Sequence, residues 1–230
     1  MRPVCRGPVP QEDGQEVVFS DYGEARPHLA QTLGRYCSYC ERWIAASLAV
    51  EHVQPKSLRP DLALAWDNLL LACANCNSAK GNQPIELPDY YWPDSDNTAR
   101  AFAYAADGSV SPSPTLPPDA TERAARTLGL TGLSRHPSGA CRPSASDYRW
   151  MDRLEAWDLA TRYLRQYQQQ RTRPETIADV MRERGLWSVW MTVFRAHPEV
   201  CRALVDELPG TADCFDPETC EPIPRPGGAL

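Results

Sequence analysis

Long apolar runs are missing from this chain of 230 residues. No segment approaches the roughly 18 consecutive apolar residues that a membrane-spanning helix requires, which argues against a transmembrane protein. The first residues, MRPVCRGPVPQEDG, also contain no apolar stretch, so we expect no secretory signal peptide there. We therefore predict a cytoplasmic protein, long enough for one domain with a sizeable core or for two small ones.

Lysine is scarce, and negative charge prevails over positive charge. Only two of the 24 basic residues are lysines, Lys56 and Lys80, and the formal net charge is −6. The acidic excess lies in residues 82–120 and 199–230, whereas residues 121–185 hold twelve arginines against eight acidic residues. The global charge therefore gives no positive support for nucleic-acid binding, but it leaves room for a local phosphate-binding surface.

Cysteine, by contrast, is abundant. Nine cysteines would suit a disulfide-rich protein, but the odd number and the missing signal peptide argue against one. Four of the nine form two CxxC pairs, Cys37 with Cys40 and Cys73 with Cys76. Two pairs at this spacing predict one structural zinc, bound at Zn–S distances of ~2.3 Å, rather than four unrelated thiols. The others are predicted to be free thiols: Cys5, Cys141, Cys201, Cys214 and Cys220.

Short elements are predicted around the CxxC pairs. Apolar periodicity indicates a helix over residues 27–35, and β-formers indicate two short strands over residues 42–44 and 48–53. Residues 54–66 are predicted to form a loop. A helix is expected to begin at Asn77 and to end at Gly81. Residues 82–119, rich in proline, aspartate and serine, predict irregular structure.

The remainder of the chain is predicted to be helical. One helix is expected to start near Ser146 as its N-cap, with an apolar face formed by Trp150, Leu154, Trp157, Leu164 and Tyr167. Others should begin near Pro174, resume after Gly185 and cover residues 199–208. The predicted division is a module over residues 1–95 with its core at 37–81, an irregular linker over 96–120, a helical region over 121–208 and a disordered tail over 209–230.

Three polar motifs accompany the CxxC pairs. They are Val50-Glu51-His52-Val53-Gln54-Pro55-Lys56, Trp66-Asp67-Asn68-Leu69-Leu70 and Cys76-Asn77-Ser78-Ala79-Lys80-Gly81. Their order and spacing over residues 37–81 resemble the HNH endonucleases. The resemblance implies an α+β fold, a small zinc-clamped ββα-metal motif, here with a mainly helical carboxy-terminal region. This chain has asparagine at position 77 where many members have histidine, which implies a metal site with oxygen ligands only.

Phosphodiester hydrolysis needs an activated water and neutralisation of charge on the phosphate. His52, with a pKa near neutrality, suits the general base. The carboxylate of Glu51 and the amide oxygen of Asn77 suit a hard divalent cation such as Mg²⁺ or Mn²⁺. The resemblance implies that Asn68 orients the loop and the His52 ring. Lys80, three residues after Asn77, is predicted to contact a phosphate.

Simpler roles compete with these assignments. Asn77 would, on the simpler interpretation, only cap its own helix, and Lys80 would only offset the negative end of that helix. Aromatic residues near the motifs have the chemistry to stack on bases, but packing on a small core is the commoner role, and we predict it for Trp43 and Trp66.

The segments CSYCE, EHVQPKS and WDNLLLACANCNSAKGN further resemble the small HNH effectors of bacterial anti-phage systems, notably Septu-type nucleases. This resemblance implies a complex with an ATPase partner, and DNA is favoured over RNA as substrate. A non-catalytic zinc module that binds nucleic acid or protein is the alternative, as is a nuclease that acts without a partner. Residues 121–208, rich in arginine, are predicted to dock a partner or the nucleic-acid backbone.

Overall fold

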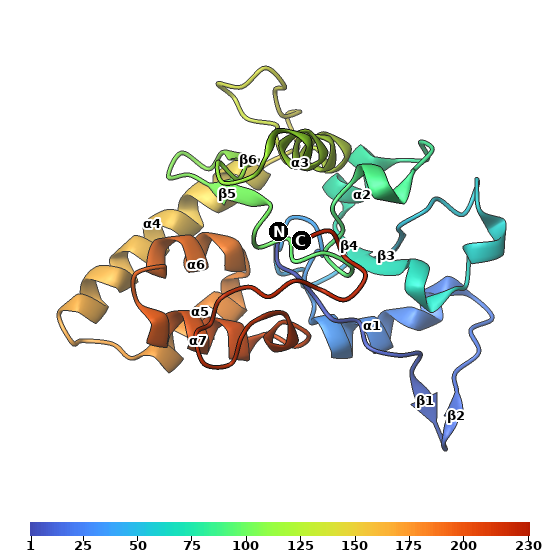
Figure 1. Ribbon diagram of the computed structural model, residues 1–230, viewed down its shortest axis with the longest axis horizontal. Coiled ribbons are helices and arrows are strands. Elements are labelled where there is room, and N and C mark those ends of the chain that lie inside the picture. The colour runs from blue at the N-terminus through green and yellow to red at the C-terminus, as the bar shows by residue number, and fades with distance from the viewer.

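Three antiparallel hairpins and seven α-helices build the α+β fold of the computed structural model, which describes residues 1–230 (Figure 1). The strands are β1 (Gln11–Glu12), β2 (Gln15–Glu16), β3 (Ala49–His52), β4 (Leu69–Ala72), β5 (Phe102–Tyr104) and β6 (Val110–Pro112). The helices are α1 (Ala25–Leu33), α2 (Ala74–Lys80), α3 (Pro118–Thr131), α4 (Arg149–Gln168), α5 (Pro174–Arg184), α6 (Trp187–Phe194) and α7 (Pro198–Glu207). None of the helices is both long and apolar enough to span a bilayer.

The hairpin of β3 and β4 lies at the centre of the amino-terminal half. Its register places Glu51 opposite Leu70 and His52 opposite Leu69. All four residues of β4 are fully buried, because α1 packs against this strand and further core residues cover the other face. Helix α2 follows β4 after one residue and packs against β3, which completes the predicted ββα arrangement. The α+β fold class is thereby confirmed.

The strand predicted over residues 42–44 is wrong. Arg42 and Trp43 form only isolated bridges, to Gly185 and Tyr36, and the pairing partner of β3 is β4 instead. Glu41, with φ of 65°, turns the chain sharply before Arg42, so a continuous strand cannot start there. The apolar run of residues 69–72 carried the signal of a buried strand.

Residues 82–119 are also more ordered than predicted, because β5 and β6 pair antiparallel within them. The turn between these strands contains Asp107 and Gly108, a dipeptide typical of hairpins. Gly108 has φ of +82°, and a Cβ there would clash with the Trp150 carbonyl oxygen. Glycine is therefore required where this hairpin approaches α4.

Helices α4 to α7 enclose a second hydrophobic cluster, and Trp187, Trp190 and Phe194 of α6 are at its centre. Helix α4 begins at Arg149 rather than near Ser146, and no side chain caps it. Its buried face also differs from the predicted aromatic stripe, whose members are only half-buried. The residues that α4 buries are Arg149, Arg153, Ala156 and Ala160.

Residues 209–230, predicted to be a disordered tail, run back across the middle of the molecule in this structure (Figure 1). Asn97 Nδ2 donates hydrogen bonds to the carbonyl oxygens of Cys214 (2.6 Å) and Ile223 (2.8 Å). Arg225 donates to the carbonyl oxygen of Val4 at 2.7 Å. Both ends of the chain therefore contact the segment around Asn97.

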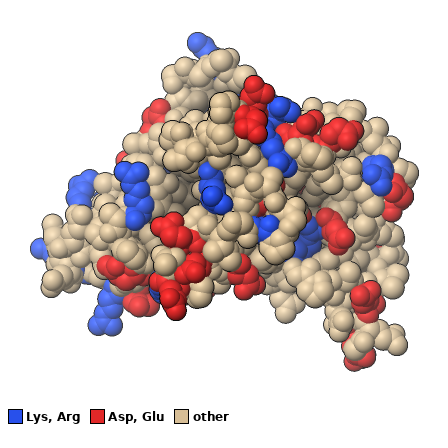
Figure 2. All heavy atoms as spheres, in the orientation of Figure 1, with Lys and Arg blue, Asp and Glu red and all other residues tan.

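Charged side chains of both signs are interspersed over the face shown in Figure 2. The β1–β2 hairpin, at the lower right, is an acidic projection because it carries Glu12, Asp13 and Glu16, all exposed. The net charge of −6 is therefore spread unevenly, and local basic surfaces have to be sought residue by residue.

Candidate active site

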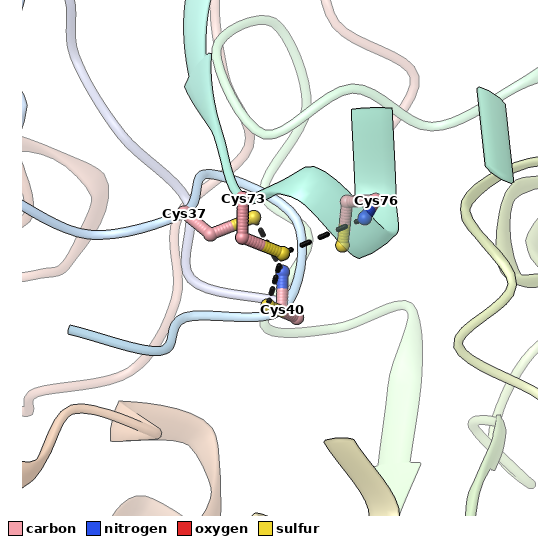
Figure 3. Close-up of side chains that lie close together, drawn as sticks. All are labelled: Cys37, Cys40, Cys73 and Cys76. Atoms are coloured by element: carbon pink, nitrogen blue, oxygen red, sulfur yellow. Dashed lines mark hydrogen bonds between the residues drawn. The ribbon is translucent and has the colours of Figure 1, made fainter. Parts of the chain in front are cut away.

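The four cysteines of the CxxC pairs converge on one point (Figure 3). Cys37 and Cys40 lie in the turn before the hairpin, Cys73 follows β4, and Cys76 lies in the first turn of α2. All four are buried, and their sulfur atoms lie within 4.8 Å of one another. The Sγ atoms of Cys40 and Cys73 are 3.6 Å apart.

This sulfur geometry suits a structural zinc. In a tetrahedral site with Zn–S distances of ~2.3 Å, neighbouring sulfur atoms are about 3.8 Å apart, close to the separation of Cys40 and Cys73. Burial raises the pKa of the Cys37 and Cys76 thiols, so these two need a cation to hold them as thiolates. The Arg149 Nη1 atom lies 3.0 Å from Cys76 Sγ and offsets the negative charge of such a cluster.

The strand β3 presents Glu51 and His52 to opposite faces of the hairpin, because successive side chains of a strand alternate. The two residues differ in surroundings accordingly. Glu51 faces α2, where it meets Lys80, and His52 faces the segment around Tyr22, which precedes α1. Both side chains are nearly closed off from solvent, and His52 is 8% exposed.

The sequence had predicted that Lys80 contacts a phosphate. In the structure, Lys80 is buried against Glu51 and does not reach solvent. Its Nζ atom lies 2.8 Å from Glu51 Oε1, and the two side chains are 1% and 5% exposed. The same ammonium donates to the carbonyl oxygen of His52 at 2.7 Å. Burial raises the pKa of the Glu51 carboxyl, and the positive charge of Lys80 opposes that rise. Lys80 therefore ties α2 to the carboxyl end of β3.

Lys80→Met is expected to lower the free energy of unfolding by about 3–5 kcal/mol, because it leaves the Glu51 carboxylate buried without its partner. Lys56→Met is the matched control, since Lys56 is the other lysine, is exposed, and has its ammonium group over the Tyr22 ring. The control should lose about 1 kcal/mol or less. Urea unfolding of both variants measures the difference, and equal losses would contradict a structural role for the buried pair.

The ring of His52 is fixed by a hydrogen bond and an aromatic contact. Its Nε2 atom is 3.0 Å from the Ala63 carbonyl oxygen, and the edge of the ring meets the Tyr22 ring at a centroid distance of 5.0 Å. A carbonyl oxygen only accepts, so Nε2 carries the proton and Nδ1 is the free basic nitrogen. Burial lowers the pKa of His52, which favours the neutral ring that a general base requires.

Asn68 holds the loop that follows β3. Its Oδ1 atom accepts from the Gln54 backbone N–H at 2.7 Å, and its Nδ2 atom donates to the carbonyl oxygens of Gln54 (2.9 Å) and Leu62 (3.2 Å). Leu62 directly precedes Ala63, whose carbonyl oxygen binds His52. Asn68 thus makes no hydrogen bond to the His52 ring and instead binds the loop that carries the Ala63 carbonyl group.

Asn77 lies in the middle of α2, not at its beginning. The helix starts at Ala74, and the Cys73 side chain occupies the capping position by accepting from the Cys76 backbone N–H at 3.5 Å. The interpretation of Asn77 as a helix cap is therefore wrong. Its side-chain amide is half-buried and has no hydrogen-bond partner within the chain, which leaves its oxygen free for a ligand.

Three contributors to the site went unnoticed in the sequence. Tyr22 lies 30 positions before His52, and the Ala63 carbonyl group has no sequence signature at all. Arg149 is distant from the CxxC pairs in the chain, and only its place within an arginine-rich segment set it apart. The structure brings all three to the motifs that the sequence did identify.

Comparison with known proteins agrees with this geometry. Residues 37–83 match the HNH endonuclease family. A stretch of 88 residues is 35% identical to the Septu protein PtuB of Bacillus thuringiensis, and it covers 35% of this chain and 34% of that protein. The similarity therefore spans about a third of each chain.

Proposed function

With an HNH endonuclease domain in residues 37–83 and distant homology to Septu protein PtuB as the premise, we propose that this protein is a metal-dependent endonuclease. It hydrolyses phosphodiester bonds of nucleic acid, with DNA as the favoured substrate. The observation that carries this proposal is the His52 ring, fixed through Nε2 by the Ala63 carbonyl with Nδ1 left free.

His52 acts as the general base of the proposed reaction. Its Nδ1 atom takes a proton from a water molecule, whose oxygen attacks the phosphorus while the P–O bond to the leaving oxygen breaks, and the leaving oxygen takes a proton from solvent. Before the proton transfer, the Ala63 carbonyl oxygen keeps the ring in the productive tautomer, and Asn68 holds the loop that presents this carbonyl. The Tyr22 ring restricts rotation of the imidazole. Each of these contacts keeps the basic nitrogen in one position before substrate arrives.

Glu51 and Asn77 would hold a catalytic Mg²⁺ or Mn²⁺. Oε2 of Glu51 and the Asn77 amide oxygen are hard donors without a hydrogen-bond partner in the chain, which fits such a cation. The bound cation supplies neutralisation of charge on the phosphate and the leaving oxygen. Lys80 holds the Glu51 carboxylate from its other oxygen, Oε1. Zinc, in contrast, belongs to the four cysteines, as a structural ion.

We further propose that the nuclease is the effector of a bacterial anti-phage defence system and acts with an ATPase partner in the cytoplasm. The support is the 35% identity, over 88 residues, to a Septu protein. The alternative is a zinc module without catalytic activity that binds nucleic acid or protein. That alternative explains the four cysteines but assigns no task to the free Asn77 amide or to the oriented ring of His52.

Metal-dependent cleavage tests the proposal. The pure protein, alone and with the proposed ATPase partner, is incubated with plasmid, phage DNA and tRNA in Mg²⁺ or Mn²⁺. We expect cleavage of DNA that stops when a chelator removes the divalent cation while the zinc stays bound. A zinc-loaded, folded protein that cuts none of these substrates, with or without the partner, would establish the alternative.

A further inference from the structure

A large groove lies outside the hairpin of β3 and β4. It has a volume of about 990 Å³ and runs between the loop of residues 42–46 and helix α4. A second groove of about 480 Å³ shares Ala45 and Ala46 with the first and continues to Ala49, the first residue of β3. Both grooves border the loop of Ala45 and Ala46, and we call them together the arginine path, which reaches from α4 to the strand that carries His52.

Positive charge prevails along the arginine path. Three carboxylates line it, and one of them, Asp152, is already paired with Arg42 at 2.8 Å. Arg162, Arg165 and Arg184 are exposed and form no ion pair within the protein. The six arginines that line the two grooves are Arg26, Arg35, Arg42, Arg162, Arg165 and Arg184. Their guanidinium groups are the residue type that best binds phosphate.

An exposed aromatic ring lies on the same path. Trp43 lines the first groove and is 39% exposed, although we had predicted that it packs in the core. The Arg35 guanidinium lies over the Trp43 ring, 5.6 Å from its centroid, and donates to the Ala45 carbonyl oxygen, which holds the loop in place. An aromatic face beside phosphate-binding groups is the arrangement on which single-stranded nucleic acids stack their bases.

The second groove approaches the proposed general base through the segment of Tyr22 and Gly23. Gly23 lines the second groove, and its neighbour Tyr22 contacts the His52 ring. The Lys56 Nζ atom lies 3.8 Å from the centre of the Tyr22 ring and adds a further positive charge there. Phosphates bound along the arginines would thus lead towards the catalytic end of β3.

We propose that the arginine path binds one unpaired strand of the DNA substrate, with its phosphates on the arginines and a base on Trp43. The inference rests on the proposed nuclease function and specifies where on the surface the DNA strand binds. A duplex cannot stack its paired bases on Trp43, so the groove selects a strand that is single or locally opened. An acidic protein surface is the competing occupant of the same residues, and the binding experiment below decides between the two.

Binding of a labelled single-stranded DNA to the His52→Ala protein, followed by fluorescence anisotropy, tests the proposal without interference from cleavage. Arg162→Glu/Arg165→Glu is expected to weaken binding at least tenfold and to reduce the salt dependence by about 0.7 for each lost phosphate contact. Trp43→Ala should weaken binding by about tenfold. Arg142→Glu/Arg171→Glu changes the net charge equally at two exposed arginines outside the path and should bind as the parent does.

Circular dichroism and zinc content establish that each variant is folded. Equal affinity of the two double variants overturns the path, as does tighter binding of duplex DNA or of RNA than of single-stranded DNA. Loss of ATPase co-purification with unchanged DNA binding also overturns it, and assigns the groove to the protein partner. Plasmid cleavage by the unmodified protein is scored separately, so that a wrong route for the strand is distinguishable from a wrong function.

Discussion

His52→Ala is expected to slow metal-dependent cleavage by about 10²–10⁴-fold, because it removes the imidazole whose free Nδ1 atom is proposed to take the proton of the attacking water. The effect should fall on the rate of the chemical step and leave substrate binding unchanged, since the ring is 8% exposed and offers little surface to the DNA. Single-turnover cleavage of plasmid at saturating enzyme measures this step directly. The fold and the zinc content should remain those of the parent protein.

Two controls distinguish lost chemistry from lost structure. His136→Ala removes a half-buried histidine that contacts Ser138, the Asp107 carbonyl oxygen and the Trp150 ring, all outside the site, and it should cleave at the parent rate. Free imidazole added to the His52→Ala protein should restore part of the activity by serving as the missing base. Parent-rate cleavage by His52→Ala would refute the proposed mechanism outright.

Removal of one zinc ligand should have the largest effect on the fold. Cys37→Ser and Cys76→Ser are expected to yield misfolded protein with little zinc, because a structural zinc site contributes about 10–16 kcal/mol, comparable with the whole stability of a typical domain, about 5–15 kcal/mol. Elemental analysis of the parent protein should find about one zinc per chain. Thermal unfolding and metal content of each variant measure the loss.

Cys141→Ser is the matched control for these substitutions. Cys141 is exposed and lies far along the chain from the CxxC pairs, so its replacement should change neither the zinc content nor the melting temperature. A parent protein that is folded and free of zinc, with a melting curve unaffected by chelators, is the outcome that contradicts a structural zinc.

Local patterns in the sequence were sufficient to predict the cysteine cluster. Two CxxC pairs restrict where four sulfur atoms can go, and the structure brings them together as predicted. Helices that end at glycine were also predictable, because Gly34 and Gly81 adopt positive φ angles after α1 and α2. The pairing of β3 was missed because period-two alternation is absent from the fully buried strand β4.

Long-range contacts decided the features that the sequence did not predict. The burial of Lys80 depends on where Glu51 lies when α2 packs against β3, and nothing within residues 77–81 contains that information. Trp43 is exposed because the loop after Glu41 turns towards α4 instead of forming a strand. In both cases the residue type was informative, but its surroundings were set by segments far away in the chain.

The buried arginines of α4 couple the unfolding of the helical region to that of the amino-terminal half, because they bind the β5–β6 turn and the end of α3. Arg149 donates to the carbonyl oxygens of Thr131 (2.7 Å) and Gly132 (3.0 Å), and Arg153 donates to that of Gly108 at 2.7 Å. Detachment of α4 would leave these carbonyl groups without their guanidinium partners. The loss would cost several kcal/mol of the free energy of unfolding. We therefore expect the chain to melt cooperatively in one transition, and we expect that residues 37–83 do not fold on their own.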